Sequence, residues 1–168
     1  GLNHKTVSLD IREKFSISEE SARDGLLHLS EQEGIKEAVV LSTCNRTEIY
    51  AVLKEEEDKE ELYRFFLTLS GNSKAEKEYF FFYTGTECIR HLFRVDSMVL
   101  GESQILNQIK TAYTGALAVH ATRTILNTLF HRAITTGKRV RTETRISTSA
   151  VSVSYAAVKM AEKILGSL

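Results

Sequence analysis

Hydrophobic positions in the first half of the chain recur at two alternating periods. A spacing of three to four residues predicts a helix over residues 18–34, which starts with a serine N-cap. It predicts another over residues 54–71, whose first eight residues are a run of charges. Short apolar runs rich in β-branched or aromatic residues predict strands over residues 38–41, 48–53 and 79–83. The first half is therefore expected to form an α/β unit in which a polar connection joins two strands.

From residue 86 onward the hydrophobic spacing is helical. It predicts amphipathic helices over residues 86–95, 102–119 and 122–144. Residues 150–165 are apolar around much of their circumference, so a helix there needs a packing partner or a following domain. We expect three or four helices after the α/β unit.

Composition narrows the class of protein. The chain has 168 residues and 42% hydrophobic content, which suits one soluble domain with a sizeable core. Its 22 basic and 22 acidic residues cancel, so no global field attracts nucleic acid or an anionic membrane. The two cysteines lie in no C-x-x-C or Cys/His cluster, which argues against a disulfide framework and against a metal site. Without an apolar run of membrane-spanning length or a signal peptide, we expect a cytoplasmic location.

The polar connection between the strands at 38–41 and 48–53 holds the first candidate for chemistry. Cys44 lies there, two residues before Arg46. A neighbouring cation and the backbone amides of a turn favour the thiolate, which is the nucleophilic form of cysteine. A buried structural cysteine is the commoner role, and it is the role expected of Cys88 within an apolar helix pattern. The spacing leaves both roles of Cys44 open.

Other polar residues support chemistry less directly. His91 lies on the helix predicted at 86–95 and is either the acid or base that a cysteine nucleophile needs or a structural histidine. Gln104 and Gln108 lie one helical turn apart and either bind a polar ligand or face solvent. A basic stripe, the only signal for nucleic acid, is either a phosphate-binding surface or a solvated helix face; it comprises Arg132, Lys138, Arg139, Arg141 and Arg145.

The order of several motifs along the chain resembles one family. These motifs are GLNHKT at the start, STCNRTEIY around Cys44, RHLFRV around His91, DSMVLGESQILNQIK after it and KRVRTETRIS further on. Together they resemble the N-terminal part of glutamyl-tRNA reductase over nearly the whole chain. STCNR with VLGE-x-QIL is a highly specific pair.

The resemblance implies a catalytic domain whose NADPH-binding and dimerisation domains lie outside this chain. The expected fold class is α+β, with a βαββαβ (ferredoxin-like) sandwich, then a helical subdomain and the start of a long spinal helix. Residues 1–84 would form the α/β core, residues 85–148 its helical part and residues 149–168 the start of the spinal helix. The full-length enzyme would be a homodimer without a metal that binds glutamyl-tRNA and passes its product to glutamate-1-semialdehyde aminotransferase.

The resemblance also implies a reaction. The thiolate of Cys44 would attack the ester of glutamyl-tRNA, and hydride from NADPH would reduce the resulting thioester to glutamate-1-semialdehyde, the first step of tetrapyrrole (porphyrin) biosynthesis. His91 matches the activity-critical histidine, as general base or as the group that orients the ester. Arg46 and Glu48 would match the γ-carboxylate and α-ammonium of the substrate from one side of a strand. The family pattern places these residues around the substrate beside Cys44: Thr43, Asn45, Arg46, Ser97, Glu102, Ser103, Gln104 and Gln108.

Two departures from the family pattern accompany the resemblance. Ser103 stands where the family usually has proline, and Val95 runs directly into Asp96 where the family usually carries a few further residues. The chain also has no proline, so we expect loop residues to be missing here and near Thr6 and His120. Two alternatives stay open: a non-catalytic RNA-binding or regulatory module that uses the basic stripe, and a cysteine hydrolase with Cys44 and His91 as a dyad.

Overall fold

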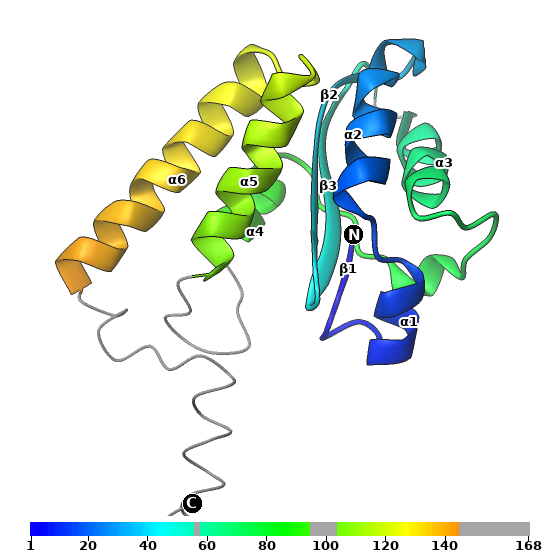
Figure 1. Ribbon diagram of the computed structural model, residues 1–168, viewed down its shortest axis with the longest axis horizontal. Coiled ribbons are helices and arrows are strands. Elements are labelled where there is room, and N and C mark those ends of the chain that lie inside the picture. Colours follow the sequence, from blue (N-terminus) through cyan, green and yellow to red (C-terminus); the bar gives the residue numbers. More distant parts are fainter. Residues whose placement is uncertain (56–57, 95–103, 145–168) are drawn as a thin grey trace, which may run out of the picture.

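A three-stranded antiparallel sheet lies between two layers of helices in the computed structural model, which describes residues 1–55, 58–94 and 104–144 (Figure 1). The strands, in the spatial order β1-β3-β2, are β1 (Leu2–Asn3), β2 (Ile35–Thr43) and β3 (Arg46–Leu53). One face carries α1 (Leu9–Lys14), α2 (Glu19–Leu27) and α3 (Lys59–Leu69). The other face carries α4 (Gly85–Arg94), α5 (Gln104–Ala118) and α6 (Thr124–Thr144). The α+β class is confirmed.

The β2–β3 hairpin is the centre of the sheet and the element that presents the candidate cysteine. Thr43 pairs with Arg46, so Cys44 and Asn45 alone form the connection. Val39, Val40 and Leu41 of β2 are buried, as expected of a strand covered on both faces. The predicted strands at 38–41 and 48–53 are confirmed, and both extend further than their apolar runs.

The strand predicted at residues 79–83 does not form in the described sheet. Lys77–Tyr79 is instead a short 3-10 helix, and the ring of Phe80 packs edge-on against the rings of Phe15, Tyr63 and Phe66 at centroid distances of 5.6, 5.3 and 5.1 Å. Only Phe81 makes strand-like contacts, because its backbone N–H and C=O both bond to Gly1, at 2.8 and 2.9 Å. Aromatic packing, not a ladder of hydrogen bonds, holds this segment.

Helix boundaries follow local chemistry more closely than hydrophobic spacing. The side chain of Ser18 accepts a 3.0 Å hydrogen bond from the backbone of Ser21, which confirms the predicted N-cap of α2. The helix predicted to run to residue 34 ends at Leu27, however, and a 3-10 turn over Leu29–Glu31 follows it. In α6, Leu126, Phe130 and Ala133 are buried as their spacing predicts, whereas Val140 is 46% exposed.

A buried carboxylate joins β2 to the start of α6. Glu37 is 4% exposed, and its two oxygens accept hydrogen bonds from the backbone N–H groups of Arg123, Ile125 and Leu126 at 2.8, 3.2 and 2.8 Å. These are N–H groups that the first turn of a helix leaves without partners. Glu37 therefore fixes α6 against the sheet.

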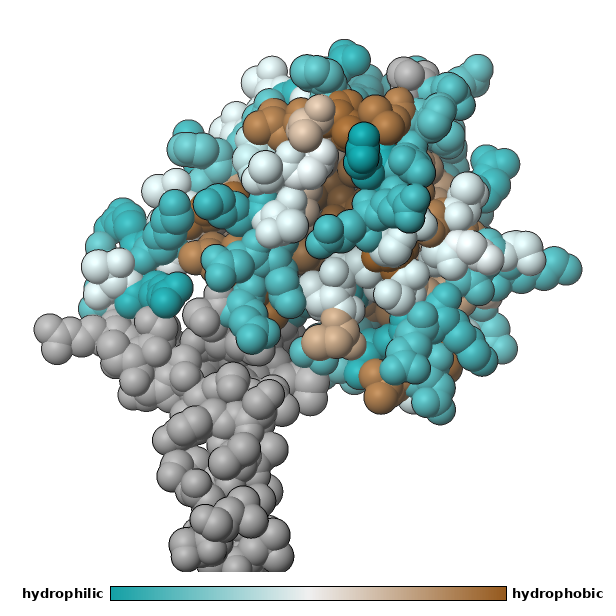
Figure 2. Space-filling view, viewed as in Figure 1, coloured by the Kyte–Doolittle hydropathy of each residue, from teal (hydrophilic) through white to brown (hydrophobic). Residues whose placement is uncertain are grey.

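The turn between α5 and α6 also touches the sheet. His120 has a positive φ of 56°, and the next residue, Ala121, accepts a 2.9 Å backbone bond from Ala38 of β2. The exposed apolar residues Leu117 and Ile125 flank this turn. Figure 2 shows a largely hydrophilic face on which hydrophobic colour appears in patches, the widest of them near the top of the view. The junction of Val95 with Asp96 and the apolar segment 150–165 lie outside the described residues. None of the helices in the described part of the chain is long and apolar enough to cross a membrane.

Candidate active site

Cys44 lies at the tip of the β2–β3 hairpin as a free, exposed thiol. Three segments hold the backbone around it. The hydroxyl of Thr43 accepts the backbone N–H groups of Asn45 and Arg46, both at 3.2 Å. The carbonyl of Cys44 accepts a bond from the Arg12 side chain at 3.4 Å, and the carbonyl of Asn45 accepts one from the backbone of His4 at 3.0 Å. The thiol is thus reachable while its backbone is anchored, which is the requirement for a nucleophile.

Arg46 points into the protein from the first position of β3. It is 3% exposed, and its guanidinium Nη1 lies 3.5 Å from Oε1 of Glu48. The two residues are two apart on one strand, so their side chains share a face, as the sequence predicts. The positive charge is therefore neutralised inside the protein by Glu48.

Glu48 is the centre of a buried polar network. Its Oε1 also bonds to Nε2 of His91 at 2.9 Å, and its Oε2 accepts a 2.7 Å bond from the hydroxyl of Tyr50. Burial alone would raise the pKa of this carboxyl, but the bond to His91, the charge of Arg46 and the bond from Tyr50 together hold it below its usual value. Glu48 is thus a carboxylate with three partners.

His91 reaches this network from α4. Its ring lies 5.0 Å, centroid to centroid, from the rings of both Phe81 and Tyr83. Because Glu48 is a carboxylate and can only accept, Nε2 carries the hydrogen of the shared bond. Nδ1 has no partner among the described residues, so it is the ring nitrogen that can bond to a further group.

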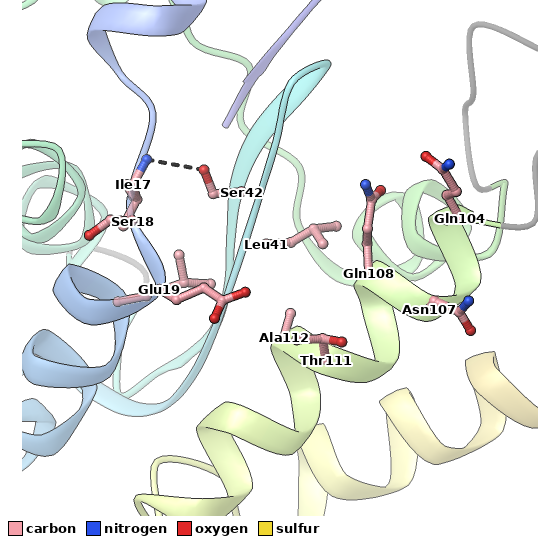
Figure 3. A pocket seen from close by; sticks show the side chains of 12 residues that line it. Ile17, Ser18, Glu19, Leu41, Ser42, Gln104, Asn107, Gln108, Thr111 and Ala112 are labelled. Carbon is pink, nitrogen blue, oxygen red and sulfur yellow. Dashed lines mark hydrogen bonds between the residues drawn. The ribbon is translucent and has the colours of Figure 1, made fainter. Parts of the chain in front are cut away.

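The two amides expected in the substrate pocket lie on α5. Gln104 is exposed at the first position of the helix, and Gln108 follows one turn later; both line a cavity between α5 and the edge of β2 (Figure 3). The side-chain oxygen Oε1 of Gln108 is buried and has no partner among the described residues. Ser97, Glu102 and Ser103 lie outside the described residues.

Two buried polar atoms without partners in the described part of the chain lie at the hairpin connection, on His4 and Arg46. Among the described residues, all the buried side-chain atoms of this kind are Nδ1 of His4, Nε of Arg46, Oε1 of Gln108 and Oγ1 of Thr122. His4 bonds to the hairpin connection through its backbone, and Arg46 begins β3. A buried unpaired polar group costs about 1–3 kcal/mol, so such groups indicate a place where a ligand completes the bonding.

Two residues with direct roles in this geometry are missing from the sequence-based site. Tyr50 bonds to Glu48, and strand alternation from Arg46 through Glu48 signals it, since all three share a face. Arg12 bonds to the carbonyl of Cys44 from 32 residues away, and no local pattern signals that contact. The second cysteine, Cys88, is half-buried. The pKa of its thiol is raised mainly by this burial and, to a smaller extent, by the negative charge of Glu48.

The fold and the site together define an α+β domain that presents an exposed thiol on a hairpin. The second strand of this hairpin carries a buried arginine and a buried glutamate, and the glutamate bonds to a partly buried imidazole from α4. Residues 1–144 match the family model described as "Glutamyl-tRNAGlu reductase, N-terminal domain". The chain belongs to this family, and the resemblance seen in its motifs is confirmed.

Similar sequences and a similar solved structure carry the same enzyme name as the family model. The chain is 49% identical over 173 residues to a glutamyl-tRNA reductase from Desulforudis audaxviator and 48% identical over 174 residues to one from Pelotomaculum thermopropionicum, covering 100% of this chain and 39% of each relative. The solved structure of glutamyl-tRNA reductase from Methanopyrus kandleri superposes with a TM-score of 0.72 at 36% identity, over 96% of this chain and 38% of that one.

The lengths of these matches carry information of their own. The chain spans about two fifths of the curated relatives it matches. Its 168 residues align with 173 positions in the first relative, so that relative carries at least five residues without a counterpart here.

Proposed function

We propose that this chain is the catalytic domain of a glutamyl-tRNA reductase and that Cys44 is its nucleophile. The thiolate sulfur attacks the carbonyl carbon of the glutamyl ester, and the bond to the ribose oxygen of the tRNA breaks. That oxygen takes up a proton, and a glutamyl thioester remains on Cys44. Reduction of the thioester by hydride gives glutamate-1-semialdehyde, restores the thiolate and begins tetrapyrrole biosynthesis.

The observation that carries this proposal is the exposed thiol on an anchored two-residue connection, in a chain that belongs to this family. A structural cysteine is normally buried as a small hydrophobe, and Cys44 is not. The exposed position also opposes the alternative of a regulatory module in which Cys44 has no chemical role.

The buried network supplies positioned polar groups for the glutamyl moiety. Nε of Arg46 is buried without a partner, and a γ-carboxylate would accept its hydrogen. Oε1 of Gln108 is likewise unpaired and would accept a hydrogen from the α-ammonium group. Glu48 already has three partners, so we assign it to orienting Arg46 and His91 and not to direct contact with the ammonium.

We assign proton transfer to His91. Glu48 fixes Nε2, which leaves Nδ1 as the group that exchanges a proton with the thiol or with the departing ribose oxygen. Thr43 and Asn45 shape the connection that carries the sulfur, and Gln104 stands at the mouth of the cavity beside it. Ser97, Glu102 and Ser103 keep the substrate-binding roles that the family pattern implies.

NADPH would supply the hydride in the intact enzyme. The residues of this chain do not fit a dinucleotide site, because the sequence contains no G-x-G-x-x-G and the described sheet is antiparallel. We therefore assign no part of hydride transfer to them. Dimerisation, a cytoplasmic location and delivery of the aldehyde to glutamate-1-semialdehyde aminotransferase are further parts of the proposal that concern the whole protein.

We also propose the finer fold and domain boundaries that the sequence predicts. Although residues 79–83 form no strand, the bonds between Gly1 and Phe81 hold this segment beside β1, at the position that the fourth strand of a βαββαβ sandwich would occupy. The α/β core would then end near residue 84, the helical part near residue 148, and residues 149–168 would start the spinal helix.

The direct test is mass spectrometry of the full-length protein after incubation with glutamyl-tRNA and without NADPH. We expect one glutamyl group on Cys44, released by hydroxylamine as a thioester would be. Cys44→Ser should lose this labile adduct, whereas the matched variant Cys88→Ser should keep it. A glutamyl group on Cys88 instead, or none on the wild-type protein, would contradict the proposal. Fast release of free glutamate despite saturating NADPH would favour a cysteine hydrolase.

A further inference from the structure

A cavity of about 360 Å³ opens beside the hairpin, where the edge of β2 lies between α2 and α5 (Figure 3). Gln108 lines it, so it adjoins the residues that the proposed function assigns to the glutamyl group. Most of its wall, however, comes from residues that this function does not use. Its chemistry is therefore a separate clue to what lies next to the glutamyl group.

The cavity suits a neutral polar ligand. Its lining contains no lysine, arginine or histidine, so it lacks the cations that a phosphate requires. Besides Gln108, the polar side chains from α5 are the amides of Gln104 and Asn107 and the hydroxyl of Thr111, and these three are exposed. The opposite wall carries Glu19, whose carboxylate extends from α2 toward the sheet in Figure 3.

The edge of the sheet adds backbone groups to this wall. Ala38 of β2 directs its N–H outward to Ala121, and strand alternation then directs the N–H and C=O groups of Val40 and Ser42 outward as well. In the described part of the chain these outward groups have no partner, and both residues line the cavity. Ile17 and Ala112 supply an apolar lining, which suits the face of a ring.

The cavity reaches the part of β2 that leads into Cys44. Ser42 is two residues before Cys44, which corresponds to roughly 7 Å at the rise of a β-strand. Under the proposed function, two groups reach that far from the glutamyl carbonyl: the glutamyl side chain and the terminal nucleoside of the tRNA. The cavity offers no cation for the γ-carboxylate, so the nucleoside is the group that fits it. That nucleoside is an adenosine, with a neutral base and free hydroxyls on its ribose.

We propose that this cavity binds the 3′-terminal adenosine of the tRNA, an inference that rests on the proposed function. Asn107, with Gln104 beside it, bonds to the N6 and N7 edge of adenine, because amides match that pattern of donor and acceptor. Glu19 accepts a hydrogen bond from the free ribose hydroxyl, as acidic residues do in dinucleotide sites. The cavity would thus hold the leaving group while Cys44 attacks.

The test measures binding of a stable amide analogue of 3′-glutamyl-adenosine to the full-length protein by calorimetry, so that no acyl transfer is needed. Asn107→Ala should raise the Kd roughly tenfold, which is within the range for one base contact. An analogue with purine in place of adenine should bind the wild-type protein about tenfold more weakly as well. Because both changes remove one contact, the purine analogue should bind Asn107→Ala no more weakly than adenosine does.

Matched residues provide the controls. Glu19 and Glu20 are both exposed in the first turn of α2, and only Glu19 lines the cavity. Glu19→Ala should weaken binding of the ribose analogue but not of its 2′-deoxy form, and Glu20→Ala should change neither. In the same way, Thr111 lines the cavity and Thr114 does not, although both are exposed on α5.

The outcomes separate the two proposals. If glutamyl-tRNA acylates Cys44 while Asn107→Ala and Glu19→Ala bind every analogue as the wild-type protein does, the adenosine site is overturned and the proposed function stands. If binding depends on these residues as described while Cys44 is never acylated, the adenosine site stands and the proposed function fails. If the losses of affinity caused by Asn107→Ala and by the purine analogue multiply when the two are combined, they remove different contacts. That result would also overturn the proposed base contact.

Discussion

Two glutamates of the sheet are buried to nearly the same extent but have different kinds of hydrogen-bond partner. Glu37 on β2 is 4% exposed and Glu48 on β3 is 3% exposed. Glu37 is satisfied by three backbone N–H groups of the α6 terminus, whereas Glu48 is satisfied by side chains, those of Arg46, His91 and Tyr50. A carboxylate that binds backbone fixes an element, and one that binds ionisable side chains sets their charge and orientation.

This difference indicates where the molecule can change. Backbone groups have no alternative protonation state, so the environment of Glu37 is constant. The partners of Glu48 include an imidazole, so its environment can exchange a proton. The end of the sheet near the hairpin is therefore the end where chemistry is possible, and the end near Glu37 holds the helices in place.

Replacement of Glu48 should have the largest effect. Glu48→Leu leaves the charge of Arg46 buried without compensation, so we expect the free energy of unfolding to fall by about 3–5 kcal/mol. Urea denaturation of the full-length protein would measure this. The double variant Arg46→Leu/Glu48→Leu should recover much of the loss, because the uncompensated charge is then gone. If the double variant is no more stable than Glu48→Leu, the charge pair is not the cause.

Replacement of Glu37 should have a smaller effect of a different kind. Glu37→Gln keeps the shape but weakens charge-assisted bonds to α6, and we expect a loss of about 2 kcal/mol in the free energy of unfolding. The alkylation rate of Cys44 in the folded protein should not change, since α6 and not the hairpin is affected. A changed thiol rate would show that the two ends of the sheet are coupled.

The difference in unfolding free energy between the wild-type protein and Glu48→Gln should depend on pH. The pKa of Glu48 is lowered in the folded state, so its carboxylate contributes stability above the unfolded value of about 4.3. That contribution is lost as the pH falls through the folded pKa. The gap in unfolding free energy between the two proteins should therefore stay constant from neutral pH down to about 4.3 and narrow at lower pH. A gap independent of pH would contradict the assigned ionisation.

Removal of the Tyr50 hydroxyl should have a modest effect on stability. Tyr50→Phe deletes one bond to Glu48 and leaves the ring packed edge-on against Phe130, so we expect a loss of about 1 kcal/mol. The pH profile of Cys44 acylation should shift, because Glu48 then orients His91 less firmly. Unchanged stability with a shifted profile would still assign the hydroxyl to positioning. An unchanged profile would remove Tyr50 from the network that serves catalysis.

The smallest expected effect concerns the second thiol. The charge of Glu48 helps to raise the pKa of Cys88, so Glu48→Gln should increase the fraction of its thiolate. Cys88 should then react faster with iodoacetamide near neutral pH, whereas Glu37→Gln should leave its rate unchanged. Equal rates in all three proteins would mean that burial alone controls Cys88.

The sequence predicts those features of the fold and the site that depend on a local pattern. Alternation predicts the β2–β3 hairpin and places Cys44 in its connection, and it puts Arg46 and Glu48 on one face. The serine that caps α2 is equally local. These features depend on neighbours a few residues away, and the sequence shows those neighbours directly.

Other features depend on distant partners. Residues 79–83 have the composition of a strand, but Phe80 packs among aromatic rings from α3 and from the chain after α1. Glu37 lies 86 to 89 residues from the N–H groups it binds, so no pattern around it indicates a helix cap. The bond between Glu48 and His91 becomes visible only when α4 is packed against β3, whereas strand alternation already places Tyr50 beside Glu48.

The bond from Arg12 to the carbonyl of Cys44 has a mechanical consequence. The helix that carries Arg12, α1, contains no buried residue, so it adds little to the core and is the most easily displaced part of the scaffold around the sulfur. A load applied to that outer helix would reach the backbone of the residue that carries the sulfur through the Arg12 side chain. The geometry of attack thus depends in part on a segment that faces water.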